Sequence, residues 1–468
     1  MSFVFYDTET TGTHTAFDQI LQFAAIRTDP ELRELERFEI RCRLLPHVVP
    51  SPKALLTNGI DVKRLTDPAL PSHYEMVRAI KAKLEAWSPA IFVGHNSMRF
   101  DEHLLRQAFY QTLHPPYLTN TNGNGRMDSL PVLQAAHFLE PGVLTVPASE
   151  KCRPTFSLER LAPTNGFVHD AAHDAMGDTE ATLYLCRLVH DRAEGVWSNC
   201  VRFARKAAVL DYAQPGEVFT FVGFAYGRAY VRVVTAIGPN PERDSDLYVF
   251  DLSYDPHDLA AFHDDDLHKL LPKSPRPVRR LSANRAPYII PYEDVPASAC
   301  VRLPAVEELG SRAAYIRDNR GLRGRLMAAV VENREKWEPS VHVEEQIYDS
   351  FIGSEDQARM TAFYQAEWSD RAALLGGFVD QRLQVLGQRL LYTEVPEVMP
   401  VDGLMSCRTD MARRFLAEEG TVPWLTLPQA IRETDELLVA STSSEVSLLK
   451  DLLGYLGRRA EEARTNME

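Results

Sequence analysis

The chain begins with a short apolar segment that ends in acidic residues, and this segment constrains the fold more than any other feature. Residues 3–7 read FVFYD, and Glu9 follows two positions after Asp7. Four consecutive apolar or aromatic residues are typical of a buried strand. Alternate side chains of a strand point to the same face, so Asp7 and Glu9 share a face where this strand ends. Taken alone, such an acidic pair is more often a turn or a helix cap than a metal site.

Alternating strand and helix patterns continue from this segment to about residue 192. The predicted strands lie at 20–29, 36–45 and 90–96, and the predicted helices at 73–87, 98–113 and 175–193. Strands that alternate with helices predict an α/β domain whose functional side chains lie at the carboxyl ends of strands.

Two further regions differ in pattern from the first. Residues 216–238 and 246–253 are rich in β-branched and aromatic residues punctuated by glycine, which predicts a small β-rich domain. After about residue 346 the helical spacing returns, for example at 360–379, and the chain ends in a charged tail. We therefore expect three domains, with bounds at 1–192, 193–345 and 346–468.

Composition narrows the class of protein. The formal net charge of −14 argues against a protein that is basic throughout, although a nucleic-acid binder needs only a local basic surface. The six cysteines are scattered without a CxxC pair, which is typical of reduced thiols. The N-terminus has no signal-peptide pattern, and no apolar run is long enough to span a membrane. We expect a cytoplasmic protein with no membrane partner.

Three more polar residues extend the acidic pattern. Asp101 lies in GHNSMRFD just after the strand predicted at 90–96, and Asp178 lies in HDAMGD early in the last predicted helix. Each alone is most often an acid favoured by the helix dipole. Together with Asp7 and Glu9, they supply the hard oxygen ligands that Mg²⁺ prefers. His173, five positions before Asp178, has a side chain whose pKa range suits proton transfer from water.

These motifs resemble, in type and order, those of a known superfamily. DTETTG, GHNSMRFD and HDAMGD are similar to the three motifs of the DEDDh 3′→5′ exonucleases, and a histidine five before the last aspartate is typical of the "h" branch. TFSLERL (155–161) resembles the Ser-Leu-x-x-Leu helix that precedes the last motif. The stretches THTAFDQILQFAAIRTD, GHNSMRFDEHLL and NGFVHDAAHDAMGDTEATL resemble the bacterial exodeoxyribonuclease I family more closely still.

The resemblance implies a fold and a set of site residues. The fold is α/β: a ribonuclease H-like exonuclease domain, then an SH3-like β-rich domain and a C-terminal helical domain. His173 would be the general base, and two Mg²⁺ ions, with Mn²⁺ as a substitute, would be held by Asp7, Glu9, Asp101 and Asp178. Thr8 and Thr10 would lie beside the terminal nucleotide, and Asn96 and Phe100, also expected to bind substrate, would lie near the site. Ser157 departs from the family, which has a basic residue there.

A substrate strand needs a positive groove with stacking surfaces. Basic clusters occur at Arg202, Arg205 and Lys206, at 269–285, and at 312–325. Any single cluster is more often a solvated face. The resemblance implies that the three domains surround single-stranded DNA with a free 3′ end, in a monomer. It also implies a pocket for the C-terminal tail of single-stranded-DNA-binding protein, for which the candidates are Arg317, Arg320 and Arg323.

The expected function is therefore 3′→5′ hydrolysis of single-stranded DNA to 5′-mononucleotides, in DNA repair and recombination. Two alternatives remain. The motifs do not read the sugar, so a 3′→5′ exoribonuclease of the same superfamily fits them as well. An inactive nucleic-acid-binding scaffold is the other alternative, and the presence of all five motif residues argues against it.

Overall fold

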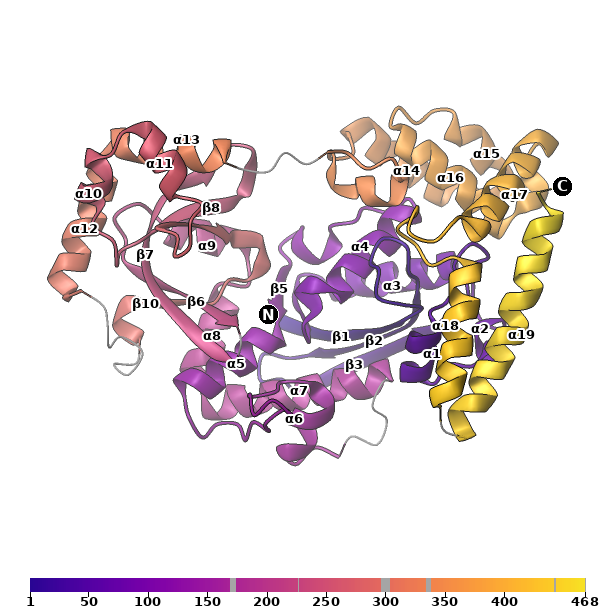
Figure 1. Ribbon diagram of the computed structural model, residues 1–468, viewed down its shortest axis with the longest axis horizontal. Coiled ribbons are helices and arrows are strands. Elements are labelled where there is room, and N and C mark those ends of the chain that lie inside the picture. The colour runs from indigo at the N-terminus through magenta and orange to yellow at the C-terminus, as the bar shows by residue number, and fades with distance from the viewer. Residues whose placement is uncertain (169–173, 226, 296–303, 334–337, 442, 468) are drawn as a thin grey trace.

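The computed structural model describes residues 1–168, 174–225, 227–295, 304–333, 338–441 and 443–467. In Figure 1 the N-terminal sheet and its helices lie at the centre, a second sheet lies on one side, and a group of helices lies on the other. No helix in the described ranges combines the length and the apolar character that crossing a membrane requires.

The first sheet is mixed, with strand order β3-β2-β1-β4-β5. Its strands are β1 Ser2–Thr10, β2 Ile20–Thr28, β3 Glu34–Arg41, β4 Ala90–Gly94 and β5 Gly125–Asp128. The first three are antiparallel neighbours, whereas β4 is parallel to β1 and β5 is parallel to β4. The last β1–β4 pair is Phe5 with Val93, so β1 continues for several residues beyond the end of its neighbour. The α/β prediction is confirmed, with β5 as a strand that the sequence patterns did not indicate.

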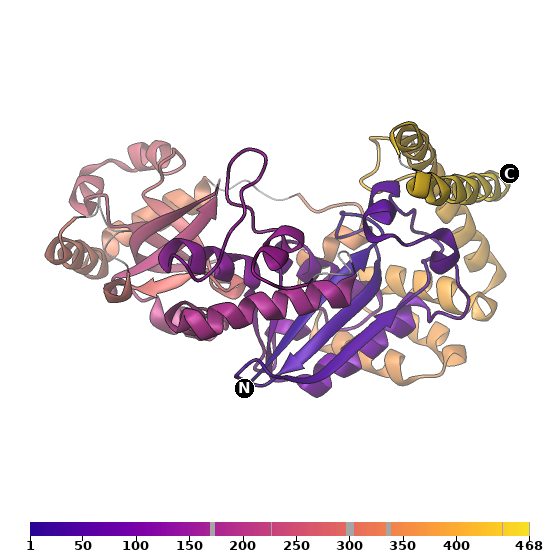
Figure 2. The same ribbon diagram turned by 90° about the horizontal axis from the view of Figure 1, so that it is seen from below.

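The two faces of β1 pack against different helices. Phe3 and Phe5 belong to the core under α5–α8, whereas Val4 and Tyr6 belong to the core under α3 and α4. Figure 2 shows α7 running along its face of the sheet. The helices of this part are α1 Pro52–Asn58, α2 Val62–Leu65, α3 His73–Trp87, α4 Asp101–Gln111, α5 Ser129–Leu139, α6 Leu158–Thr164, α7 Ala175–Arg192, α8 Glu194–Arg202 and α9 Lys206–Tyr212.

The second sheet is antiparallel throughout, with strand order β10-β6-β7-β8-β9. Its strands are β6 Phe219–Ala225, β7 Arg228–Asn240, β8 Arg243–Asp251, β9 Val278–Ser282 and β10 Ile289–Pro291. One apolar core joins it to neighbouring helices. These helices are α10 Pro256–Ala261, α11 Asp264–Leu270, α12 Val306–Asp318 and α13 Arg320–Glu332. The β-rich character predicted for this region is confirmed.

The remaining helices pack onto the first sheet domain. They are α14 Ser354–Gln365, α15 Trp368–Leu375, α16 Gln381–Glu394, α17 Val401–Leu416, α18 Leu427–Ala440 and α19 Ser443–Thr465. The helical pattern at 360–379 is divided between α14 and α15, and most of the charged tail belongs to α19. Leu55 and Leu65 of the first domain share an apolar core with Phe415 and Leu456 of α17 and α19.

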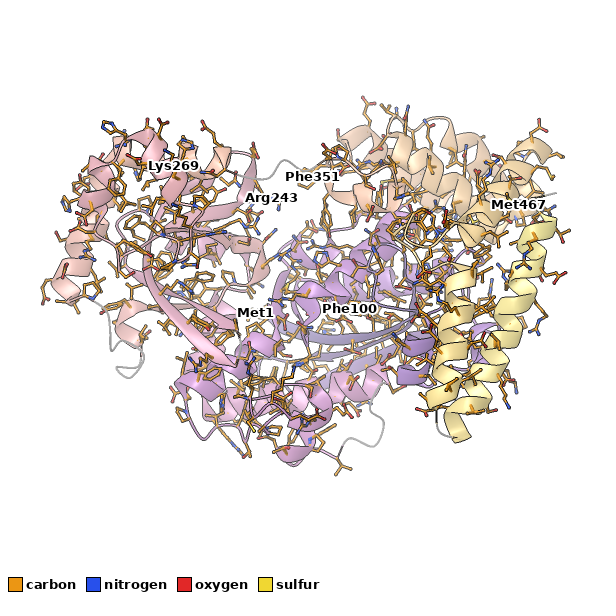
Figure 3. All side chains as sticks on the ribbon, in the orientation of Figure 1. Met1, Phe100, Arg243, Lys269, Phe351 and Met467 are labelled. Atoms are coloured by element: carbon orange, nitrogen blue, oxygen red, sulfur yellow. The ribbon has the colours of Figure 1, made fainter. Side chains whose placement is uncertain are left out.

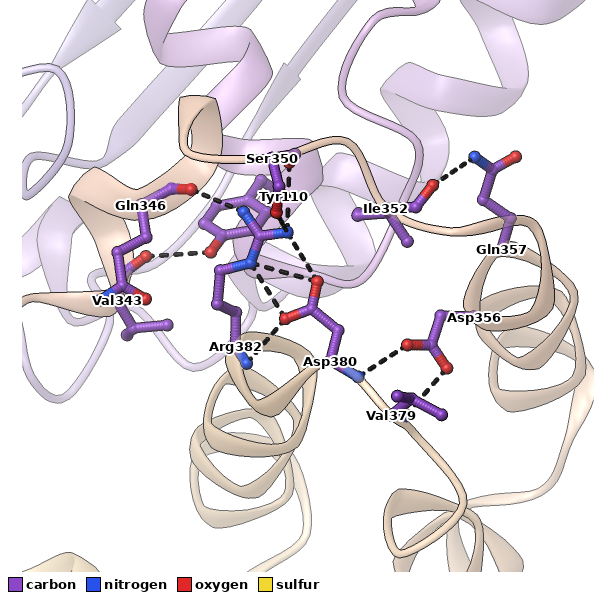
Figure 4. Close-up of polar contacts among 10 residues, drawn as sticks. All are labelled: Tyr110, Val343, Gln346, Ser350, Ile352, Asp356, Gln357, Val379, Asp380 and Arg382. Carbon is purple, nitrogen blue, oxygen red and sulfur yellow. Dashed lines mark hydrogen bonds and ion pairs between the residues drawn. The ribbon is translucent and has the colours of Figure 1, made fainter. Parts of the chain in front are cut away.

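A segment that we call the strap (residues 340–352) connects the two sheet domains to the helices. The Tyr110 hydroxyl donates to the Val343 carbonyl oxygen at 3.0 Å, and Arg382 donates to the carbonyl oxygens of Gln346 and Ser350 at 2.7 and 3.2 Å (Figure 4). Asp380 holds the Arg382 guanidinium in place at 2.6 Å. The strap is therefore fixed between α4 and α16.

Candidate active site

Three carboxylates gather at the end of β1. One oxygen each of Asp7, Glu9 and Asp178 lies within 4.8 Å of the others. Asp7 and Glu9 share a face of the strand because side chains alternate along it, and that face is the one covered by α7. Asp178 lies in the first turn of α7 and approaches from that side.

The start of α7 is fixed to the sheet by a second acid. Asp174 accepts hydrogen bonds from Gln22 of β2 at 2.9 Å and from Arg41 of β3 at 2.5 Å. The Asp178 backbone N–H then donates to the Asp174 carbonyl oxygen at 3.0 Å. Since Gln22 is the cross-strand partner of Glu9, the same bonds set the distance between Glu9 and Asp178. Sequence reasoning missed this role, although Gln22 and Asp174 both lie in the stretches that carry the family resemblance.

Asp101 reaches the site from the opposite face. Its Oδ1 accepts a hydrogen bond of 2.6 Å from the Thr8 hydroxyl, and its side chain is buried. Asp178 approaches from the face that α7 covers, so these two acids lie on opposite faces of β1, and Asp101 lies outside the group of three. The turn before α4 is tight, since a Cβ at Gly94 would lie 2.6 Å from the Cβ of Ser97.

The Asp128 carboxylate fixes that turn. It accepts from the backbone N–H groups of Asn96 at 2.8 Å, Met98 at 3.2 Å and Leu130 at 3.0 Å. Burial nevertheless raises the pKa of Asp128 to about 6. The turn carries the chain from β4 into α4, so Asp128 helps to place Asp101. No pattern in the sequence singled it out.

The negative charge of the acidic residues at the end of β1 is not balanced by positive charge around them. Burial, followed by the charges of Asp101, Asp178 and Glu9, raises the pKa of Asp7 well above its ordinary value. Burial and the neighbouring acids raise the pKa of Glu9 to about 8. Burial raises the pKa of Asp101 to about 6, although the bond from Thr8 opposes this shift. Mutual repulsion among buried carboxylates is what a bound cation relieves.

The residues present fit divalent ions. Every side chain in the group offers carboxylate oxygen, the ligand type of hard cations such as Mg²⁺. Asp101 is near enough for its charge to act on Asp7, so two faces of β1 contribute acids to one site. The expected base, His173, lies outside the described residues.

The four residues expected to bind substrate differ in their contacts and in their exposure. The Thr8 hydroxyl donates its hydrogen bond to Asp101, and the Thr10 hydroxyl donates to the Gly12 carbonyl oxygen at 2.7 Å. Asn96 is exposed, in the left-handed region at φ 56°. Phe100 is half-buried against the core under α3 and α4, near the middle of the view in Figure 3.

The basic cluster of Arg202, Arg205 and Lys206, a candidate for binding the substrate strand, already has partners within the protein. Lys206 pairs with Asp244 at 2.7 Å, and Arg205 donates to the Gly123 carbonyl oxygen at 3.0 Å. The Arg202 guanidinium lies 4.7 Å from the centre of the Tyr212 ring. These contacts tie α8 and α9 to their surroundings, and the role of the cluster in strand binding stays a prediction.

The candidate pocket for a partner protein spans the junction of α12 and α13. Arg317 pairs with the adjacent Asp318 at 2.8 Å, Arg320 is exposed, and Arg323 is half-buried. Within the described part of the chain, the Nε of Arg323 has no hydrogen-bond partner. These arginines lie on one short stretch of surface, and their role stays a prediction.

A further surface combines two exposed aromatic rings, those of Tyr348 and Phe351, with the half-buried ring of Tyr117. We call Tyr117, Tyr348 and Phe351 the aromatic shelf. Phe351 is 85% exposed, and its ring centre lies 5.9 Å from that of Tyr117. Arg106, which is buried and paired with Glu102, lies over the Tyr117 ring at 5.2 Å. Arg243 of the second sheet is close enough for its charge to act on Tyr117, and Figure 3 shows it beside Phe351. Rings beside positive charge are the elements with which proteins hold single strands.

Comparison with known proteins identifies two families along the chain. Residues 4–186 match the family described as "Exonuclease", and residues 341–459 match "Exonuclease I C-terminal domain". Exodeoxyribonuclease I of Escherichia coli is 29% identical over 407 residues, 82% of this chain and 84% of that protein. Its counterpart in Haemophilus influenzae is 26% identical over 376 residues, 77% of this chain and 79% of that protein.

Solved structures agree with these matches over almost the whole chain. E. coli exonuclease I in complex with a dA16 oligonucleotide has a TM-score of 0.85 and 26% identity, covering 98% of this chain and 99% of that one. Exonuclease I of Methylocaldum szegediense has a TM-score of 0.83 and 25% identity, covering 100% of both. The prediction of a ribonuclease H-like exonuclease fold followed by C-terminal helices is confirmed. The SH3-like character of the second sheet and the domain bounds at 192 and 345 stay predictions. With its acidic group, its fold and both family matches in agreement, the chain belongs to the bacterial exodeoxyribonuclease I family.

Proposed function

We propose that this protein is a 3′→5′ exodeoxyribonuclease that degrades single-stranded DNA to 5′-mononucleotides, in DNA repair and recombination. The observation that carries the proposal is the group of Asp7, Glu9 and Asp178 at the end of β1, in a fold shared with exonuclease I. Divalent ions, with Mg²⁺ as the physiological choice and Mn²⁺ as a substitute, fit its all-oxygen ligands.

The chemistry is hydrolysis of the last phosphodiester of the strand. Asp7, Glu9, Asp101 and Asp178 would hold two metal ions, which when bound lower the pKa of a water and stabilise charge on the scissile phosphate. His173 accepts the proton of the attacking water. The water oxygen bonds to phosphorus while the bond from phosphorus to the 3′ oxygen of the preceding nucleotide breaks. A 5′-mononucleotide leaves, and the shortened strand keeps a 3′-hydroxyl.

The aromatic shelf supports a single-stranded substrate. Base faces in a duplex are stacked on each other, so exposed rings such as Phe351 bind them only after strand separation. E. coli exonuclease I forms complexes with dA16 and dT13 oligonucleotides and with ssDNA. Stacking does not read the sugar, so an exoribonuclease is the second candidate function.

We also propose a partner, an oligomeric state and a compartment. A related structure is a complex of exonuclease I with single-stranded-DNA-binding protein, which supports such a partner. We propose that the C-terminal tail of that partner binds a pocket at Arg317, Arg320 and Arg323. The protein acts as a monomer in the cytoplasm. The described cysteines are free thiols, which agrees with a reducing compartment.

Digestion of matched DNA and RNA oligonucleotides tests substrate, polarity and metal dependence together. With a 5′ label and Mg²⁺, single-stranded DNA should give a ladder that shortens from the 3′ end, whereas EDTA or a blocked 3′ end should stop it. Duplex DNA and RNA should be degraded far more slowly. Faster loss of RNA would establish the second candidate function instead.

Replacing His173 by alanine is expected to reduce turnover by about 10²–10⁴-fold, the usual contribution of a general base. Strand binding should stay intact because the carboxylates and the aromatic shelf are unchanged. Single-turnover rates and fluorescence anisotropy of a labelled strand measure the two effects separately. Equal losses of rate and binding would show that His173 is structural.

A further inference from the structure

The residue after Asp101 is a buried carboxylate at the centre of a dense hydrogen-bond network. Glu102 is 2% exposed. Its oxygens accept from the side chains of four residues, which are Tyr6 at 3.2 Å, Arg106 at 2.9 Å, Thr119 at 2.6 Å and Arg126 at 2.7 Å. A carboxylate without such partners would be very unfavourable at this depth.

Two of the four partners, Tyr6 and Arg106, come from elements that carry the acids, namely β1 and α4. Tyr6 immediately precedes Asp7 on β1, and Glu102 immediately follows Asp101 at the start of α4. The Tyr6–Glu102 bond therefore joins the two backbone segments that present Asp7 and Asp101. On the same face of β1, the Thr8–Asp101 bond makes a second connection between these segments.

The network also reaches the second sheet. Arg126 lies on β5, and while its Nη1 donates to Glu102, its Nη2 donates to the carbonyl oxygen of Asn284. Asn284 lies in the short helical turn that follows β9. One guanidinium thus connects the edge of the first sheet, the start of α4 and the second sheet.

Stability alone does not account for such a network. A buried ion pair is often no more stabilising than well-packed apolar side chains, since desolvation offsets the attraction between the charges. Its bonds are directional, however, and they fix the relative position of the groups that make them. The network therefore contributes fixed positions more than stability, and it does so next to the acidic group, whose function depends on the positions of its carboxylates.

We propose that Glu102 is a positioning residue that sets the separation of Asp7 and Asp101 through Tyr6, and so the affinity of the site for divalent ions. This inference rests on the proposed metal-dependent function. Glu102 itself is 2% exposed, so it is too deeply buried to touch substrate.

Two matched pairs of variants test the proposal. Tyr6→Phe and Tyr110→Phe each remove one buried hydroxyl, but the Tyr110 hydroxyl bonds the strap at Val343. Glu102→Gln and Glu344→Gln each remove one buried charge with two arginine partners, but those of Glu344 are Arg389 and Arg414. Each control residue matches the tested residue in burial and in the group removed, but its bonds lie away from the acidic group.

Calorimetric titration of Mg²⁺, without substrate, is the main measurement. Tyr6→Phe and Glu102→Gln should bind Mg²⁺ about tenfold more weakly, as loss of supporting hydrogen bonds around metal ligands does elsewhere. Tyr110→Phe and Glu344→Gln should keep wild-type affinity, even where melting temperature falls. In nuclease assays Tyr6→Phe and Glu102→Gln should need more Mg²⁺ for half-maximal rate, with KM for the strand unchanged.

Equal Mg²⁺ affinities within each pair would overturn the positioning role, whatever the nuclease activity. Weaker Mg²⁺ binding by Tyr6→Phe in a protein that cleaves no nucleic acid would leave the positioning role standing and remove the proposed function. The two failures are therefore distinguishable.

Discussion

Asp7→Asn is expected to abolish nuclease activity and, without divalent ions, to raise the melting temperature. The ions contribute several kcal/mol of charge stabilisation in such reactions, so loss of a ligand should cost about 10³-fold or more in rate. Burial and the neighbouring acids raise the pKa of Asp7 in the folded protein. Charging it therefore costs stability above its unfolded pKa of about 3.9, and the amide removes that cost.

The raised pKa values of the acidic group also predict how the stability of the metal-free protein depends on pH. Glu9 has a pKa of about 8 in the folded protein against about 4.3 in the unfolded chain. Between these values the folded state binds more protons, so stability should fall as pH rises through this range. Mg²⁺ should reverse the loss in wild type and have little effect on Asp7→Asn.

Thermal unfolding with EDTA or Mg²⁺ from pH 5 to 9 measures both effects. Asp29→Asn is the control, because Asp29 is an acid paired with Arg33 at the surface, away from the site. It should leave activity and the Mg²⁺ response intact. An Asp7→Asn protein that keeps nuclease activity would show that the acidic group is not the catalytic site.

Glu344→Ala should destabilise the protein by about 3–5 kcal/mol, the usual cost of leaving buried charges without their partner. Glu344 accepts from Arg389 at 2.8 Å and from Arg414 at 2.7 Å, and its side chain is 3% exposed. Arg414 in turn lies 4.2 Å from the centre of the Trp424 ring. Truncation therefore affects the strap, α16 and α17 together.

The pH dependence of this contribution is opposite to that of Asp7. Burial alone would raise the pKa of Glu344, but Arg389 and Arg414 outweigh burial, and the pKa is lowered. Its contribution is full above the unfolded pKa of about 4.3 and is lost as pH falls through the lower folded value. The stability difference between wild type and Glu344→Ala should shrink in acid.

Hydrogen exchange of α16 and α17, together with urea unfolding, measures this destabilisation and locates it. Glu355→Ala is the control. Glu355 pairs with Arg359 in the same helical region, but its side chain is 79% exposed, so its loss should cost about 0–1 kcal/mol. Equal effects of the two substitutions would contradict the assignment of Glu344 to a buried junction.

The parts of the fold that the sequence predicted are those that depend on local patterns. The runs at 3–7 and 20–29 are β1 and β2, and the periodicity at 73–87 is α3. β5 escaped prediction because GRMD is short and half charged. Arg126 is buried there only because Glu102, distant in sequence, neutralises it. A pairing of this kind leaves no periodic signal.

The candidate site was predictable in composition but not in arrangement. Asp7, Glu9, Asp101 and Asp178 were all identified from motifs, and the structure groups three of them. That Asp101 lies on the other face of β1, bonded to Thr8, depends on how α4 crosses the sheet. The residues that support the acids, such as Asp174, Gln22 and Asp128, were missed since each is an ordinary polar residue until its partner is known.

The apolar core shared by the first domain and the last helices has a consequence during synthesis. Leu55 and Leu65 leave the ribosome at least 350 residues before Phe415 and Leu456, which cover them. At ~5–20 residues per second, that interval is on the order of tens of seconds. Until α17 and α19 have been made, the nascent exonuclease domain therefore presents a bare apolar face, of the kind that chaperones bind and that drives aggregation. A message that stops before α17 would leave that face permanently in water.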